Sequence, residues 1–319
     1  MKDILVLHTG GTIAMQENAT GEVSPGATNP LMDAHLDIPA DVNLIVEDIF
    51  NLPSPHITPE HMLQLKNRIQ EVDVAGVVIT HGTDTLEETA FFLDTTIGDG
   101  CPIVLTGAMR SSNELGSDGL YNFESAIRVA ACPEARGKGV LVVMNDEIHT
   151  ARYVTKTHTT NVATFRTPTF GPIGLVTKQR ILFYQELIVN DRLAVDAVAG
   201  HIPIIKAYAG MTEELFELLS PATIDGLVIE ALGAGNLPPQ TLPAIKRLLD
   251  QEIPIVLVSR CFNGVVEPVY AYDGAGKQLA DMGVLFLNGI NSQKARLKLL
   301  IALNHPLKGA DLKTFMVTQ

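Results

Sequence analysis

Long apolar runs are missing from the sequence. The longest, at 139–144 and 253–258, have only the length of a strand, whereas a helix that crosses a membrane needs about 20 apolar residues. Apolar residues nevertheless make up 46% of the 319 residues and charged residues 18%, a composition that supports a packed core and not a disordered chain. We therefore expect a soluble globular protein that has no membrane partner.

Cysteine is also scarce. Cys101, Cys132 and Cys261 are odd in number and show neither a CxxC pair nor the Cys/His spacing of a metal site. His149 and His158 likewise form no metal spacing with an acidic residue, so no metal is expected. The chain starts with a strand-like segment and shows no signal-peptide pattern, which together with the few cysteines predicts a cytoplasmic protein.

Basic residues are outnumbered. The 23 lysines and arginines stand against 36 aspartates and glutamates, which gives a formal net charge of −13. A protein that binds nucleic acid needs clustered basic side chains to contact the phosphates. Nucleic acid is therefore not an expected partner.

Apolar, β-branched segments alternate with helical patterns along most of the chain. Continuously apolar strands separated by helices predict a parallel sheet with both faces covered. Thr58, Pro59 and Glu60 are typical of a helix start, because they supply a cap, a proline at the first position and an acid in the first turn. The predicted strands are 4–7, 42–46, 76–80, 103–106, 140–144, 227–230, 255–259 and 284–287.

The alternation of strands and helices breaks once along the chain. We therefore predict an α/β protein with a larger N-terminal parallel-sheet α/β domain over 1–190, a linker over 191–211 and a smaller C-terminal α/β domain over 212–319. Helices predicted over 212–219 and 239–249 each lead to a strand of the second domain.

Four predicted strands are followed by segments rich in threonine, glycine and charged residues. The segments are TGGTIA at 9–14, HGTDT at 81–85, TGAMR at 106–110 and VTKT at 154–157. Ligands of open parallel sheets bind beyond the carboxyl ends of the strands, and glycine there lets backbone N–H groups approach a ligand closely. Threonine suits strands and glycine suits turns, so either motif alone is weak evidence. The GxGxxG spacing and the GxxxxGK(S/T) motif are both missing, which makes nucleotide binding the weaker interpretation.

Nucleophilic catalysis is the other interpretation of these segments. A threonine hydroxyl is a poor nucleophile at neutral pH and needs a base to take its proton. A lysine can serve as that base when its surroundings lower its pKa, and an aspartate can orient it. Thr83, Asp84 and Lys156 have the side chains for such a relay, although the sequence does not show that they meet. His8 and His81 are interpreted as structural residues.

At these motifs the chain resembles the bacterial-type L-asparaginases, a family that includes the glutaminase-asparaginases. The resemblance runs from TGGTIA at 9–14 to NSQKAR at 291–296. It implies a threonine nucleophile, Thr12, and a relay of a second threonine, an aspartate and a lysine. The relay residues in this sequence are Thr83, Asp84 and Lys156.

The resemblance implies a two-step acyl transfer. Thr12 attacks the side-chain amide carbon of L-asparagine, ammonia leaves, and water hydrolyses the β-aspartyl ester. The relay either deprotonates Thr12 or activates the water, and backbone N–H groups of Thr12 and of Thr83 or Ala108 stabilise the oxyanion. L-Glutamine is a minor substrate in this hypothesis, and no metal or cofactor is needed.

The same resemblance implies substrate-binding residues in both domains. Ser54 corresponds to a serine that binds the α-carboxylate of the substrate, and Gly82 contacts the substrate through its backbone. Asn236 corresponds to an asparagine that reaches the active site of a neighbouring subunit, and Asp273, ahead of Glu267, is the candidate for the acid that the neighbour supplies. A homo-oligomer, in this family usually a dimer of dimers, is therefore implied. The expected substrate-binding residues are Gly11, Ser54, Pro55, Gly82, Ala108, Asn236 and Asp273.

Three features depart from the family pattern. Residues 15–50 contain no tyrosine, although the family often has one there to activate the nucleophile, and Asn18 lies near that place. Pro55 stands where a glutamine is common. Cys101 has no cysteine near Val74, where some secreted members form a disulfide. The first two departures motivate an alternative, a non-catalytic sensor that binds aspartate or asparagine on the same fold.

Overall fold

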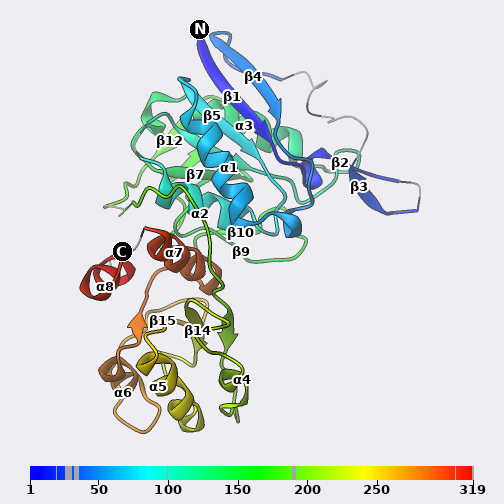
Figure 1. Ribbon diagram of the computed structural model, residues 1–319. Coiled ribbons are helices and arrows are strands. Elements are labelled where there is room, and N and C mark those ends of the chain that lie inside the picture. The colour runs from blue at the N-terminus through cyan, green and yellow to red at the C-terminus, as the bar shows by residue number, and fades with distance from the viewer. Residues whose placement is uncertain are drawn as a thin grey trace. The chain divides into compact units, whose positions relative to one another are not determined.

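The structure, a computed structural model, describes residues 1–18, 20–25, 31, 36–98, 100–188, 192–305 and 307–317. Contacts divide the chain into two compact units, Met1–Ile188 and Val189–Gln319. Each unit has a sheet of its own with helices packed on it (Figure 1). Among the described residues, no helix is both long enough and apolar enough to cross a membrane.

The main sheet of the N-terminal unit has eight strands. They are β1 (Lys2–His8), β4 (Val42–Asp48), β5 (Gly76–Thr80), β6 (Ile103–Thr106), β7 (Val140–Met144), β8 (Glu147–Thr150), β11 (Gly174–Val176) and β12 (Ile181–Phe183). Their order across the sheet is β12-β11-β8-β7-β6-β5-β1-β4. The strands from β4 to β7 in this order are parallel, and β8, β11 and β12 join the β7 edge in antiparallel pairing. The sheet is therefore mixed, and the predicted parallel arrangement holds for five of its strands.

A tight turn explains why the sheet becomes mixed after β7. The two residues between β7 and β8, Asn145 and Asp146, have φ values of 50° and 66°. Positive φ at both residues of a two-residue connection is typical of a type I′ hairpin, which pairs the flanking strands in antiparallel. The chain thus turns back at once and does not cross over through a helix.

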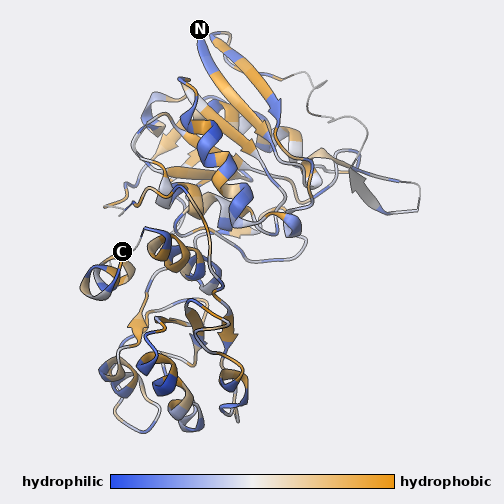
Figure 2. Cartoon of the chain, in the orientation of Figure 1, coloured by the Kyte–Doolittle hydropathy of each residue, from blue (hydrophilic) through white to orange (hydrophobic). Residues whose placement is uncertain are grey.

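Three helices cover the two faces of the sheet: α1 (Pro59–Gln70), α2 (Leu86–Thr96) and α3 (Gly119–Ala130). On one face, Ile4, Val78 and Val104 of the strands share a buried cluster with Phe123 and Ile127 of α3. Helix α2 contacts β6, β7 and α1. Figure 2 shows the central strands in orange and α1 largely in blue. Burial on both faces accounts for the continuously apolar strands of the sequence.

Helix α1 begins where the sequence predicts. Thr58 caps the helix in a capping box with His61, and Pro59 occupies the first helical position. Met62 and Leu65 are then buried on the side that faces the core. The start of α1 is therefore determined by local residues, the capping threonine and the proline that follows it, and could be predicted from the sequence.

Short elements shape the loops of this unit. They are the 3₁₀ turns η1 (Thr12–Ala14), η2 (Ser54–His56) and η3 (Pro133–Ala135), the hairpin of β2 (Met15–Glu17) with β3 (Val23–Pro25), and the hairpin of β9 (Thr155–Lys156) with β10 (Phe165–Arg166). The turn η3 lies between α3 and β7. The turn η1 follows β1 and η2 follows β4, so both lie at the edge where parallel sheets bind ligands.

The C-terminal unit holds a four-stranded parallel sheet. The strands are β13 (Ile204–Lys206), β14 (Leu227–Ala231), β15 (Ile255–Ser259) and β16 (Leu285–Phe286), in that order across the sheet. The helical elements are α4 (Glu214–Glu217), η4 (Pro239–Thr241), α5 (Leu242–Asp250), α6 (Gly276–Met282), α7 (Ser292–Asn304) and α8 (Gly309–Val317).

Two details of this unit differ from the sequence prediction. The range 191–211, predicted as a linker, contains β13, which pairs with β14 as the edge strand of the sheet. This strand has only three residues and follows Pro203 directly, so the apolar residues Ile202, Ile204 and Ile205 were not recognised as a strand. The helix predicted over 212–219 is reduced to the single turn α4. Residues 189–191, where the predicted boundary falls, lie outside the described residues.

Candidate active site

The glycine turns that follow β1 and β5 are in direct contact. Gly11 has φ +85°, and a Cβ atom on it would lie only 2.3 Å from Cα of Gly82. No side chain fits between two backbones at that distance, and positive φ favours glycine in addition. Because Thr12 follows Gly11 and Thr83 follows Gly82 directly, this contact brings the two threonine motifs to one place. The facing of the two hydroxyl groups stays a prediction.

The loop after β4 meets the same turns. A Cβ atom on Gly10 would lie 2.6 Å from the backbone nitrogen of Leu52, and one on Gly82 would lie 2.7 Å from Cβ of Ser54. Ser54 is buried, and its hydroxyl oxygen accepts a hydrogen bond from the backbone N–H of Asp84 at 3.2 Å. Thr85 donates from its hydroxyl to the carbonyl oxygen of Ser54 at 2.8 Å. Three loops that are far apart in the chain are thus fixed against one another.

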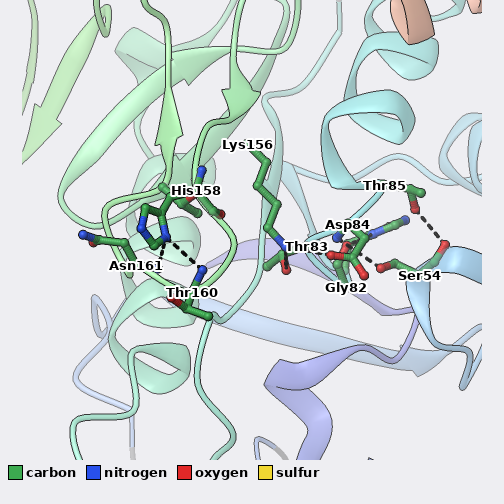
Figure 3. Close-up of polar contacts among 11 residues, drawn as sticks. Ser54, Gly82, Thr83, Asp84, Thr85, Lys156, His158, Thr160 and Asn161 are labelled. Atoms are coloured by element: carbon green, nitrogen blue, oxygen red, sulfur yellow. Dashed lines mark hydrogen bonds and ion pairs between the residues drawn. The ribbon is translucent and has the colours of Figure 1, made fainter.

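The strand β9 supplies the cation of the site. Nζ of Lys156 donates to Oγ1 of Thr83 at 3.0 Å and lies 2.7 Å from Oδ1 of Asp84. Figure 3 shows the lysine side chain extending from its strand to these two residues. The three predicted relay residues therefore meet, although 73 positions separate Lys156 from Thr83.

The members of this cluster differ in exposure. Thr83 is buried, the side chain of Lys156 is 16% exposed, and that of Asp84 is 59% exposed. An ion pair with one partner so open to water contributes little to stability. Its effect is geometric, because the carboxylate fixes the ammonium beside the hydroxyl of Thr83. An arrangement of hydroxyl, amine and carboxylate is suited to moving a proton to and from a nucleophile.

A buried histidine orders the turn at Gly82. Nδ1 of His81 lies 2.8 Å from the carbonyl oxygen of Gly82, and Nε2 lies 2.9 Å from Oγ1 of Thr89. A carbonyl oxygen only accepts, so Nδ1 carries the proton and Nε2 accepts from the threonine hydroxyl. Burial lowers the pKa of His81 from 6.5 to about 4. His81 is thus a neutral, fully bonded residue that holds the turn.

The other predicted residues of this unit lie around the same loops. Ala108 is buried, and a Cβ atom on Gly119 would lie 3.3 Å from Cβ of Ala108 and 3.1 Å from Cγ1 of Ile13, the residue after the predicted nucleophile. Pro55 lies exposed in η2 next to Ser54. These positions are compatible with the predicted roles, which the structure does not test.

Asn18 makes its hydrogen bonds within its own turn. Its side-chain oxygen accepts from the backbone N–H groups of Thr20 and Glu22, both at 2.9 Å, and its amide nitrogen donates to Glu22. Asn18 therefore closes the turn between β2 and β3. Parts of the predicted loop over 15–50, at 19, 26–30 and 32–35, lie outside the described residues.

Asn236 and Asp273 belong to the C-terminal unit. The side-chain oxygen of Asn236 accepts from the backbone N–H of Gly276 at 3.1 Å, and Leu237 donates from its N–H to the carbonyl oxygen of Gly274 at 2.9 Å. Asp273 is exposed beside this contact. The two predicted residues thus sit on neighbouring segments of one unit, whereas the relay residues belong to the other.

An open cavity of about 380 Å³ lies beside the relay. Its lining residues are all of polar or charged type and come from the start of α2 and from the chain that begins at Lys156. The lining residues are Asp84, Glu87, Lys156, Thr157, His158 and Thr159. Within the described part of the chain, no group of three or more histidine, cysteine or acidic side chains is arranged to hold a metal ion.

Two family models match almost the whole chain. The model described as the N-terminal domain of asparaginase matches residues 3–189, and the model described as the glutaminase/asparaginase C-terminal domain matches residues 201–316. The chain belongs to the asparaginase family.

Known asparaginases are similar to this chain over nearly its full length. A probable L-asparaginase of Deinococcus radiodurans is 40% identical, with 97% of this chain and 95% of the relative covered. An L-asparaginase of Bacillus licheniformis is 36% identical, with 95% of each chain covered. The crystal structure of a probable cytoplasmic L-asparaginase from Campylobacter jejuni has a TM-score of 0.85 and 32% identity, covering 99% of this chain and 98% of that one.

Sequence reasoning about this asparaginase missed part of the site. It gave no role to Glu87, which is buried and accepts a hydrogen bond from the hydroxyl of Thr155 at 3.1 Å, or to His158 in the cavity wall. Glu87 lies in the first turn of α2, and Asp84 precedes that helix. The two acids are only three positions apart in the sequence, which was a usable signal for Glu87. The position of His158 gave no such signal.

Proposed function

We propose that the protein hydrolyses the side-chain amide of L-asparagine to L-aspartate and ammonia, with L-glutamine as a minor substrate. The observation that carries the proposal is the cluster of Thr83, Asp84 and Lys156 beside the glycine contact that anchors Thr12. The names of the related proteins support the same reaction.

The proposed reaction has two steps. The hydroxyl oxygen of Thr12 attacks the side-chain amide carbon, the relay takes the hydroxyl proton, and the amide nitrogen leaves as ammonia after it receives a proton. In the second step, water attacks the β-aspartyl ester and loses a proton to the relay, and the Thr12 oxygen recovers a proton as aspartate forms. Thr83 and Lys156 pass the protons in both steps: Lys156 accepts a proton as the neutral amine and returns it as the ammonium, while Asp84 holds its Nζ in place.

Substrate binding follows from the loops around the relay. In this proposal Ser54 and the backbone of Gly82 and Gly11 contact the α-carboxylate end of the substrate, next to Pro55. The N–H groups of Thr12 and of Thr83 or Ala108 stabilise the oxyanion. Each such donor is worth about 3–4 kcal/mol of transition-state free energy.

The experiment is a measurement of ammonia release from L-asparagine by the purified protein and by the variants Thr12→Ala and Thr83→Ala. We expect both variants to lose at least about 100-fold in kcat. Thr177→Ala is the matched control, because its hydroxyl bonds only within a turn to Arg180. Full activity in either of the first two variants would refute the proposed roles.

The site is further proposed to be completed by a second copy of the chain. Asn236 and Asp273 of a neighbouring C-terminal unit would contact the substrate, so the active form would be a homo-oligomer, a dimer of dimers. Light scattering combined with activity measurements tests this. A tetramer that loses activity on dissociation supports it, and an active monomer contradicts it.

The sensor alternative makes a different prediction. A sensor would bind L-aspartate in calorimetry and release no ammonia from L-asparagine. The family and its relatives favour the enzyme, because the matched proteins are named as asparaginases.

We also propose a cytoplasmic location. All three cysteines, Cys101, Cys132 and Cys261, carry free thiols, as proteins of reducing compartments do. The similar Campylobacter jejuni protein is described as cytoplasmic. Cell fractionation followed by an immunoblot tests the location.

A further inference from the structure

The loop over 157–164 joins β9 to β10 and is held together by its own side chains. Thr157 donates from its N–H and from its hydroxyl to the carbonyl oxygen of Thr164, at 2.9 and 2.8 Å. Oγ1 of Thr164 accepts from the N–H of His158 at 2.7 Å and donates to the carbonyl oxygen of His158 at 2.6 Å. These bonds continue the pairing of β9 with β10, so the strand that carries the lysine and the loop form one hydrogen-bonded unit.

The imidazole of His158 fastens the tip of this loop. Its Nδ1 accepts from the backbone N–H groups of Thr160 and Asn161, both at 3.0 Å (Figure 3). A ring nitrogen accepts only through its lone pair, so Nδ1 carries no proton and the ring is the neutral tautomer with its N–H at Nε2. Both bonds depend on this one lone pair.

The fastened loop is a wall of the cavity at the relay. Lys156, Thr157, His158 and Thr159 line the cavity consecutively. A rearrangement of the loop therefore changes the backbone that follows the lysine directly, and with it the placement of Nζ against Oγ1 of Thr83.

Charged groups line the same cavity as the imidazole. Asp84 and Glu87 line it from the start of α2, and Lys156 on β9 is two residues away in the chain. On β10, Arg166 pairs with Glu147 at 2.7 Å.

We propose that His158 is a positioning residue for Lys156 and that it works through the two backbone hydrogen bonds that its Nδ1 accepts. The inference rests on the proposed function, because it describes how the relay of that reaction keeps its geometry. His158 does not touch the reacting atoms in this account. It keeps the loop closed.

The test measures kcat and KM for L-asparagine at pH 8 in the wild type, His158→Ala and His158→Asn. An asparagine side-chain oxygen can accept from the backbone N–H groups two and three residues ahead. We expect His158→Ala to lower kcat about three- to tenfold, the effect of losing exposed hydrogen bonds of this kind. His158→Asn should restore most of kcat.

Asn161→Ala is the matched control. It removes a hydrogen bond of the same loop, from the N–H of Ala163 to the side-chain oxygen of Asn161 at 2.8 Å, but leaves the backbone N–H groups that bond to His158 in place. Its kcat should stay within about twofold of the wild type. An unchanged kcat in His158→Ala, or a kcat in His158→Asn as low as that of His158→Ala, would overturn the inference.

A second measurement separates this inference from the proposed function. Hydrogen–deuterium exchange of the peptide that covers 157–164 should increase in His158→Ala at pH 8, after correction for the intrinsic rate, and His158→Asn should restore its protection. If the protein releases no ammonia but the loop behaves in this way, the proposed function fails and the histidine-fastened loop stands. An active protein whose loop exchange is the same in all variants overturns the inference alone.

Discussion

Acidification should destabilise the fold through His81, the buried histidine that holds the Gly82 turn. In the folded protein its pKa is lowered to about 4 by burial, from an ordinary value of 6.5. Between these two values the unfolded chain binds a proton that the folded protein does not bind. Stability therefore falls as the pH drops through this range, and it is fully present above about pH 6.5.

The size of the effect follows from the two pKa values. Going from pH 7 to pH 4.5, the His81 contribution to the free energy of unfolding should fall by roughly 2–3 kcal/mol, since one pKa unit corresponds to about 1.4 kcal/mol. His8 adds to the loss in the same direction, because burial also lowers its pKa. The comparison must therefore isolate His81.

The assay is urea unfolding at pH 7 and pH 4.5 for the wild type and for His81→Gln, at one protein concentration. Glutamine offers an N–H toward the carbonyl oxygen of Gly82 and an oxygen toward the hydroxyl of Thr89, and it does not titrate. We expect the variant to be less stable at pH 7, because its fit is imperfect, but to lose less stability on acidification. If both proteins lose the same free energy between the two pH values, the assignment to His81 is wrong.

Three further predictions concern the relay, the glycine contact and a strained residue. Lys156→Met should lower kcat for ammonia release by about 100-fold or more, while urea unfolding shows a stability change below about 1 kcal/mol because Asp84 is 59% exposed. Gly82→Ala should cost about 1–3 kcal/mol in urea unfolding and raise KM, because the added Cβ would lie 2.7 Å from Cβ of Ser54; wild-type values for both would contradict the packing. Glu252→Gly should raise the unfolding free energy by about 0.5–1 kcal/mol, because Glu252 has φ 61° after helix α5, and a loss of stability would contradict it.

The central strands could be predicted from the sequence because they are buried on both faces. Segments such as Gly76–Thr80 and Val140–Met144 are continuously apolar, and the structure confirms both with the predicted bounds. The strands β8, β11 and β12, which extend the sheet from β7, were missed. Their antiparallel pairing starts from the turn at Asn145 and Asp146, where both φ angles are positive, and the sequence does not signal that turn because neither residue is glycine. Strand β13 was missed because three residues at a sheet edge leave no periodic pattern.

The relay could be predicted in its members but not in its geometry. Thr83 and Asp84 belong to a motif that the sequence shows, whereas their contact with Lys156 depends on the two-residue strand β9 and its pairing with β10. His158 could not be assigned, because its function in the loop is to accept backbone hydrogen bonds, and nothing in the neighbouring residues indicates that. When a side chain acts by bonding to the backbone, the types of the neighbouring residues do not reveal that role.

The relay is partly exposed to solvent, and this exposure is a reason to expect that a second copy of the chain completes the site. Hydrogen bonds to a developing oxyanion are strongest where water is excluded, yet Asp84 is 59% exposed and the adjacent cavity is open. In the proposed reaction, the N-terminal unit supplies the nucleophile and the relay, and it leaves Asp84 of the relay in contact with solvent. A protein segment that covers this part of the relay and also contacts the substrate would both exclude the water and add substrate-binding groups. Asn236 and Asp273 of a neighbouring copy would meet both requirements, which is the physical reason for expecting activity to depend on assembly.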